Sequence, residues 1–195
     1  GCSSIWGNSS PSTPYTVNAK GQGPAWDNSL FEDNAEFGFG MLLAQNAIRD
    51  ELKEKVEKVA ADERASEEVK AACKEWLDTF GIGVLNGSAT DKLVAALEGI
   101  DCPTCKYIVA NKNFLAKKSQ WIFGGDGWAY DIGFGGVDHV LASGKDINIM
   151  VFDTEVYSNT GGQSSKATKT GAVAQFAAGG KETKKKDLAS IAMSY

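Results

Sequence analysis

Two short polar segments carry the residue types that hold a diphosphate through a metal ion. Gly125-Asp126-Gly127 places one carboxylate between two glycines, which let a diphosphate approach the backbone closely. Thr154 supplies a hydroxyl 28 positions after Asp126, and the backbone carbonyl of Val156 lies two residues further on. A carboxylate alone would repel a diphosphate, so Asp126 makes chemical sense only with a divalent cation between the two. Since magnesium prefers such oxygen ligands together with phosphates and water, these residues predict a magnesium site.

The elements around these segments predict that they meet in space. Residues 120–123 and 147–152 are short apolar runs with strand character, and residues 128–143 between them have the pattern of one helix. This order predicts a βαβ unit with parallel strands, and ligands bind at the carboxyl ends of such strands. We therefore expect Asp126 and Thr154 to face one another, with Asp126 exposed at a strand end. Residues 154–170 are predicted as a loop and residues 187–195 as the start of a helix.

The rest of the chain is predicted to be an extended N-terminal loop followed by helices. Turn-forming residues dominate positions 1–32, and an apolar helical pattern then runs from Phe37 to Ile48, with Asp33 or Asn34 as its cap. Gly38 and Gly40 in its first turns indicate either close approach of a ligand to the backbone or tight helix packing. Helical patterns continue through the heavily charged residues 49–79, through 89–99 with Ser88 as the cap, and weakly through 104–118.

Taken together, the motifs resemble those of pyruvate:ferredoxin (flavodoxin) oxidoreductases, thiamine-diphosphate enzymes. The matching segments are residues 124–133 (GGDGWAYDIG), 154–163 (TEVYSNTGGQ), 1–7 (GCSSIWG) and 21–26 (GQGPAW). The resemblance implies an α/β, three-layer thiamine-diphosphate-binding fold with a mostly parallel central sheet. It implies that residues 1–195 form part of that domain, interrupted by a charged helical insertion at about 46–118, and that the chain is a segment of a longer polypeptide.

The resemblance also implies a role for each matched residue. Asp126, Thr154 and the Val156 carbonyl would hold magnesium on the diphosphate. Gly125, Gly127 and Trp128 would line the diphosphate side, and Glu155, Tyr157, Ser158 and Asn159 would lie at the cofactor, with Asn159 contacting the intermediate derived from pyruvate. The implied reaction is oxidative decarboxylation of pyruvate, with acetyl transfer to coenzyme A and electron transfer through iron–sulfur clusters to ferredoxin or flavodoxin.

The four cysteines divide into one that matches the family and three that do not. Cys2, followed by Ser3, matches the cysteine that in the family binds a 4Fe-4S cluster near thiamine. Such clusters need four ligands, and the resemblance places the other three outside this sequence. Cys102 and Cys105 form a CxxC pair without a second pair or a nearby histidine, so we expect a structural role for them rather than a metal site. His139 is likewise expected to be structural, and Cys73 matches no family ligand.

Composition excludes several other classes of protein. The chain has 195 residues, 43% of them hydrophobic, and a formal net charge of -5, which argues against a nucleic-acid-binding surface. No apolar stretch is long enough to span a membrane, and we expect a cytoplasmic homo-oligomer. Two other functions remain open: a module that binds a magnesium diphosphate ligand without catalysing a reaction, and a mononucleotide-binding domain. The second is disfavoured because no Gly-x-x-x-x-Gly-Lys-Ser/Thr motif is present.

Overall fold

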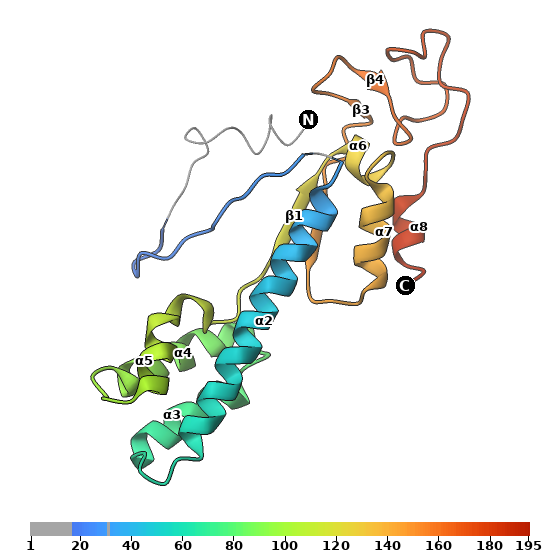
Figure 1. Ribbon diagram of the computed structural model, residues 1–195. Coiled ribbons are helices and arrows are strands. Elements are labelled where there is room, and N and C mark those ends of the chain that lie inside the picture. The colour runs from blue at the N-terminus through green and yellow to red at the C-terminus, as the bar shows by residue number, and fades with distance from the viewer. Residues whose placement is uncertain (1–16, 31) are drawn as a thin grey trace. The chain divides into compact units, whose positions relative to one another are not determined.

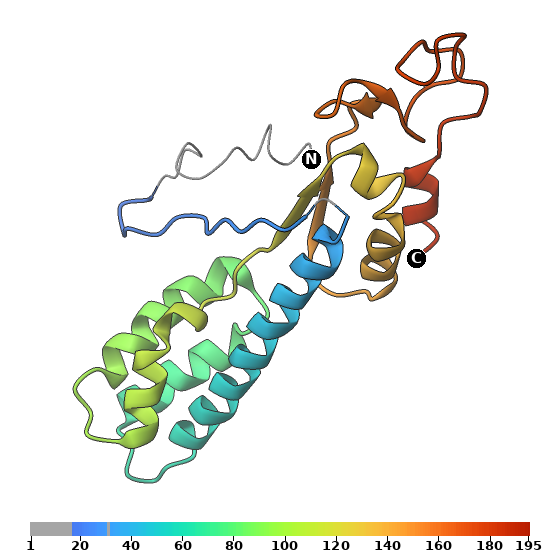
Figure 2. The ribbon, with the colours of Figure 1, turned by 45° about the horizontal axis from the view of Figure 1, so that its top comes forward.

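The computed structural model describes residues 17–30 and 32–195, which divide into two compact units (Figures 1 and 2). One unit contains Gln120–Tyr195 together with the described residues up to Gly40, and the other is Met41–Ser119. Helix α2 (Asn34–Ala60) contributes its first turns to the one and the remainder to the other. No helix in these described ranges is long and apolar enough to cross a membrane.

The unit Met41–Ser119 is entirely helical. After the end of α2 it contains α3 (Glu67–Asp78), α4 (Gly83–Leu97), α5 (Pro103–Ala110) and the short 3-10 helix η1 (Lys112–Phe114). Ser66 caps α3 by accepting a hydrogen bond from the Val69 backbone N–H. The apolar faces of these helices enclose one core. Its largest fully buried members are Leu52, Val56, Trp76, Leu93, Leu97, Ile108 and Leu115.

The predicted start of the third helix is wrong. Helix α4 begins at Gly83, six residues before the expected position 89, and Ile82 precedes it without a side-chain cap. Ser88 lies inside the helix, and its hydroxyl donates to the Leu85 carbonyl of the preceding turn. The backbone N–H groups of Leu85 and Asn86 donate to the Ile82 carbonyl, so backbone bonds close this first turn. The sequence therefore has no capping side chain that marks the start of this helix.

The other unit contains the predicted βαβ arrangement. Strand β1 (Trp121–Gly124) pairs in parallel with β2 (Asn148–Val151), with Ile122 opposite Ile149 and Gly124 opposite Val151. This parallel pair with helices confirms the predicted α/β class. Ile122 packs with Trp128, Ala129, Val137 and Val140 from the connecting helices to form the buried core of this unit.

The connection between β1 and β2 contains two helices where the sequence predicts one. Helix α6 (Asp126–Ala129) is a single turn, and α7 (Phe134–Ala142) starts after a bend. At the bend the Gly133 N–H donates to the Gly127 carbonyl, 3.2 Å away. A Cβ at Gly133 would lie 2.7 Å from the Trp128 carbonyl oxygen. The glycine at 133 thus permits a close backbone approach, at which the chain bends between the end of α6 and the start of α7.

The region after β2 is not wholly the loop that the sequence predicts. Strands β3 (Val156–Tyr157) and β4 (Gln163–Ser164) form a short antiparallel hairpin within residues 154–170. Gly161 and Gly162 have positive φ values of 135° and 81°, which the hairpin turn requires and glycine adopts without strain. Helix α8 (Leu188–Ala192) follows, capped by Asp187, and matches the helix expected from residue 187.

Candidate functional site

Asp126 lies buried between the loops that follow β1 and β2. Its side chain is fully inaccessible to solvent, so the expectation of an exposed aspartate is wrong. One carboxylate oxygen, Oδ1, accepts a 3.0 Å hydrogen bond from the Thr154 backbone N–H, and Oδ2 accepts a 2.9 Å hydrogen bond from the Ser165 hydroxyl. Burial raises the pKa of Asp126, while the bonds from Ser165 and Thr154 oppose that rise. These bonds compensate part of the cost of burying a carboxylate.

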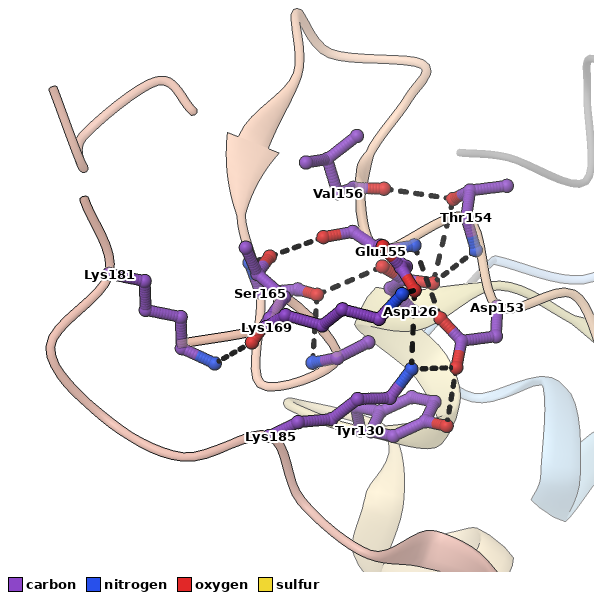
Figure 3. Close-up of polar contacts among 12 residues, drawn as sticks. Asp126, Tyr130, Asp153, Thr154, Glu155, Val156, Ser165, Lys169, Lys181 and Lys185 are labelled. Carbon is purple, nitrogen blue, oxygen red and sulfur yellow. Dashed lines mark hydrogen bonds and ion pairs between the residues drawn. The ribbon is translucent and has the colours of Figure 1, made fainter. Parts of the chain in front are cut away.

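The three predicted metal ligands meet at this point (Figure 3). The Thr154 hydroxyl lies 3.5 Å from Oδ1 of Asp126 and donates to the Val156 carbonyl oxygen at 2.9 Å. A carboxylate, a hydroxyl and a backbone carbonyl are thereby gathered at the ends of two adjacent parallel strands. All three are hard oxygen donors of the kind that magnesium binds, so the donor chemistry fits that ion.

A second acidic group, Asp153, lies beside the site and is missed by the sequence reasoning. Its Oδ2 accepts hydrogen bonds from the Tyr130 hydroxyl at 2.9 Å and from Lys185 Nζ at 2.5 Å. Burial opposes ionisation of Asp153, but the bonds from Lys185 and Tyr130 outweigh it and hold the pKa of Asp153 below its ordinary value. Asp153 is therefore ionised and paired with Lys185, the middle residue of three consecutive lysines at positions 184–186.

Glu155, between two of the proposed ligands, has a strained backbone. Its φ is +65°, in the left-handed region that a residue with a side chain rarely adopts. Its N–H donates to Oδ1 of Asp153 at 3.1 Å, and its carbonyl accepts a hydrogen bond from the Thr168 hydroxyl. Its carboxylate pairs with Lys169 at 2.9 Å. Glu155 thus points to the surrounding residues rather than to the oxygens of Asp126 and Val156.

The remaining residues predicted to contact the cofactor differ in how deeply they are buried. Gly125 is buried and precedes α6, and Gly127 is partly buried within its single turn. Trp128 is buried, and its Nε1 finds no hydrogen-bond partner within the described ranges.

Tyr157 is partly buried, and burial, together with a hydrogen bond to Asp131, raises its pKa. Ser158 and Asn159 lie exposed in the turn between β3 and β4, and the hydrogen bonds among Asp126, Thr154 and Val156 do not include them.

The cysteines and the histidine give no second centre in the described part of the chain. Cys2 and Ser3 lie outside the described residues. Cys102 caps α5, its sulfur accepting from the Cys105 N–H at 3.4 Å, and Cys105 is buried in the helical core. The described ranges hold no group of three potential metal-binding side chains among His, Cys, Asp and Glu. The His139 ring meets the Phe39 ring edge-on, 5.9 Å between centroids.

Comparison with known proteins shows which enzymes this chain resembles. Residues 108–195 match the family model of the thiamine pyrophosphate enzyme C-terminal TPP-binding domain. The whole chain is 55% identical to the pyruvate-flavodoxin oxidoreductase of Klebsiella pneumoniae and 56% identical to the pyruvate:ferredoxin oxidoreductase of Moorella thermoacetica. The chain therefore matches, along its whole length, one segment of pyruvate:ferredoxin (flavodoxin) oxidoreductases.

The family relatives are much longer than this chain. The chain spans about 17% of the length of the Klebsiella and Moorella oxidoreductases. It is also 52% identical, over its full length, to the mitochondrial pyruvate dehydrogenase [NADP(+)] of Euglena gracilis and spans 11% of that protein. All of the chain is matched in each relative, whereas the TPP-binding family model begins at residue 108. The site around Asp126 and Thr154 lies inside the TPP-binding match.

Proposed function

We propose that this chain holds thiamine diphosphate through magnesium in an enzyme that oxidatively decarboxylates pyruvate to acetyl-CoA and CO2. The observation that carries the proposal is the convergence of the Asp126 carboxylate, the Thr154 hydroxyl and the Val156 carbonyl. These are the oxygen donors needed to bind magnesium, and the ion would in turn bind the diphosphate. Asp126 would supply the negative charge, while Thr154 and Val156 would add neutral oxygens.

The remaining matched residues would position the cofactor. Gly125 and Gly127 would let the diphosphate approach the backbone at the start of α6. The Nε1–H of buried Trp128, which has no hydrogen-bond partner among the described residues, would supply a donor. The hairpin β3–β4 would carry Tyr157, Ser158 and Asn159 to the cofactor and substrate side. Thiamine diphosphate, when bound, supplies the nucleophilic carbon for attack on the 2-oxo group. In this proposal Asn159 contacts the group derived from pyruvate.

The electron path and the other partners lie largely outside the chain. Cys2, followed by Ser3, would be one ligand of a 4Fe-4S cluster whose other ligands come from the remaining domains of the same enzyme. Electrons would pass through such clusters to ferredoxin or flavodoxin, and coenzyme A would accept the acetyl group. The two electron acceptors are those in the names of the relatives, and the cluster and coenzyme A follow from the resemblance that includes the motif around Cys2. The proposal includes a cytoplasmic homo-oligomer, with residues 1–195 as part of the thiamine domain and 46–118 as its helical insertion.

Calorimetric titration of thiamine diphosphate into the full-length enzyme tests the proposal. Binding should require magnesium, and Asp126→Asn should weaken it at least tenfold at saturating magnesium. The reason is that a contact to a charged group contributes about 1.5–3 kcal/mol. Asp138→Asn is the matched control, because Asp138 lies on α7 and bonds to Tyr195 instead. Equal affinities of the unmodified enzyme and Asp126→Asn would refute the metal assignment. A preparation with no visible cluster absorbance would favour a binding module over the enzyme.

A further inference from the structure

Three of the four residues in the turn Ser165–Thr168 are buried, although the turn lies in a polar loop. The exposed fractions of Ser165 and Thr168 are 5% and 1%, and Ala167 is fully buried. Internal hydrogen bonds close the turn: the Ser165 N–H donates to the Thr168 hydroxyl at 2.9 Å, and the Ala167 N–H donates to the Ser165 hydroxyl at 3.0 Å. Surface loops seldom bury such polar residues, so these hydroxyls have specific partners.

Each hydroxyl of the turn also donates outward, to a different side of the proposed metal site. The Ser165 hydroxyl donates to Oδ2 of Asp126, leaving Oδ1 to Thr154. The Thr168 hydroxyl donates to the Glu155 carbonyl, which fixes the peptide plane between Glu155 and Val156. One rigid turn therefore contacts the loop after β1 and the loop after β2 at once. Figure 3 shows the hydrogen bond from Ser165 to Asp126.

The hydrogen bond from Thr168 stabilises an unfavourable backbone conformation at Glu155. A residue with a side chain at φ +65° costs free energy, and it persists only where its surroundings hold it. The holding groups here are the Thr168 hydroxyl on the carbonyl side and Asp153 on the N–H side. Because Thr154 and Val156 flank Glu155, the conformation of this residue sets the direction of the two neutral ligands relative to each other.

We propose that the Ser165–Thr168 turn positions the magnesium ligands, Ser165 by orienting the Asp126 carboxylate and Thr168 by holding the strained Glu155 peptide. The inference rests on the proposed function, since it assigns these hydroxyls to the same metal site. Neither hydroxyl is a metal ligand in this proposal. Groups that hydrogen-bond to a ligating carboxylate fix its orientation, and their loss usually weakens metal binding by about 10- to 100-fold.

The test is the magnesium concentration that half-saturates thiamine diphosphate binding, measured calorimetrically with the full-length enzyme. Ser165→Ala and Thr168→Val should each raise it by about tenfold or more, and Thr168→Ser should keep it near the unmodified value because the hydroxyl is retained. Ser164→Ala and Thr170→Val are the matched controls. Thr170 lies in the same loop but donates to the Thr183 carbonyl, and the Ser164 hydroxyl takes no part in the contacts described above.

A second measurement separates positioning from folding. In metal-free Ser165→Ala, hydrogen exchange should accelerate only beside Asp126, where one buried hydrogen bond is lost. Exchange in α7 should be unchanged, because the apolar core stays intact. If Ser165→Ala and Thr168→Val reach half-saturation at the same magnesium concentration as their controls, the positioning role is overturned. The proposed function would then still stand. Absence of magnesium-dependent binding in the unmodified enzyme would instead overturn both.

Discussion

The Thr154 backbone N–H donates a 3.0 Å hydrogen bond to the Asp126 carboxylate, across 28 residues of sequence. This bond joins the loops that leave the carboxyl ends of two parallel strands, β1 and β2. It holds the carboxylate beside the Thr154 hydroxyl, whose oxygen contacts the Val156 carbonyl. Hydrogen bonds within the protein thus hold the proposed ligands close together. This preorganisation reduces the rearrangement that metal binding requires.

The burial of Asp126 makes opposite predictions for two substitutions. Asp126→Asn removes the desolvated charge but keeps an oxygen for the Thr154 N–H, so the metal-free enzyme should keep or gain stability around β1 and α6. Asp126→Ala leaves the Thr154 N–H and the Ser165 hydroxyl without their acceptor and should cost about 1–3 kcal/mol. Hydrogen exchange of peptides covering residues 120–130 measures both. Equal loss of protection in the two variants would contradict this view of Asp126.

Gly124 should tolerate no side chain. A Cβ at this position would lie 2.0 Å from Cε3 of the buried Trp128 indole, so Gly124→Ala must displace the ring or the strand. Overpacking of this kind typically costs about 1–3 kcal/mol. We expect faster hydrogen exchange across β1 and weaker thiamine diphosphate binding. Gly135→Ala is the control on α7, where a Cβ would meet nothing within 4 Å, and a gain of up to about 1 kcal/mol in helix stability is expected there.

The two arginines of the chain should differ sharply in their contribution to stability. Arg49 is buried and donates to the carbonyls of Leu115 and Phe80 and to Oδ1 of Asn86. Arg49→Met would leave these buried acceptors short of a donor, at a cost of about 1–3 kcal/mol. Amide exchange in α4 should therefore accelerate about tenfold or more.

The matched variant is Arg64→Met, which removes an exposed pair with Asp62. Exposed ion pairs contribute at most about 1 kcal/mol, so exchange in α4 should barely change. Similar exchange rates for Arg49→Met and Arg64→Met would show that the buried hydrogen bonds do not stabilise the helical unit.

The thiols of the helical unit should react with iodoacetamide in a fixed order. Hydrogen bonds from Cys105 lower the pKa of Cys102, whereas burial raises the pKa of Cys73 to about 11 and that of Cys105 to about 12. The thiolate is the reactive form, so at pH 8 Cys102 should be alkylated first. Its rate should rise with pH until its thiol is fully ionised, while Cys73 and Cys105 stay protonated over that range.

Peptide mass spectrometry of partly alkylated enzyme resolves the three sites. Cys102→Ser should protect its peptide and leave the iron content of the enzyme unchanged, since serine is also a good helix cap. Faster labelling of Cys73 than of Cys102 would contradict the burial of Cys73. Loss of one cluster's worth of iron in Cys102→Ser would contradict a purely structural role for the CxxC pair.

Some features of this protein follow from the sequence by itself. Gly125-Asp126-Gly127 after an apolar run, and Thr154 after the next, predict the ends of two parallel strands because local apolar patterns and the rules of βαβ connection suffice. The structure places those strands and residues accordingly. Local pattern is less reliable where backbone geometry depends on packing. The bend at Gly133 and the start of α4 at Gly83 are examples, since neither has a side-chain signal of its own.

Only the tertiary structure decides the surroundings of the carboxylate. Ser165 reaches Asp126 across 39 residues, and Lys185 reaches Asp153 across 32. A Ser-x-x-Thr turn and a run of lysines are visible in the sequence, but nothing local states which acceptors they meet. Burial has the same origin: Asp126 looks like an exposed strand end until the loop 165–168 covers it. The sequence determines which groups are available, and the folding of distant segments against one another determines which of them pair, because hydrogen bonds act only at short range.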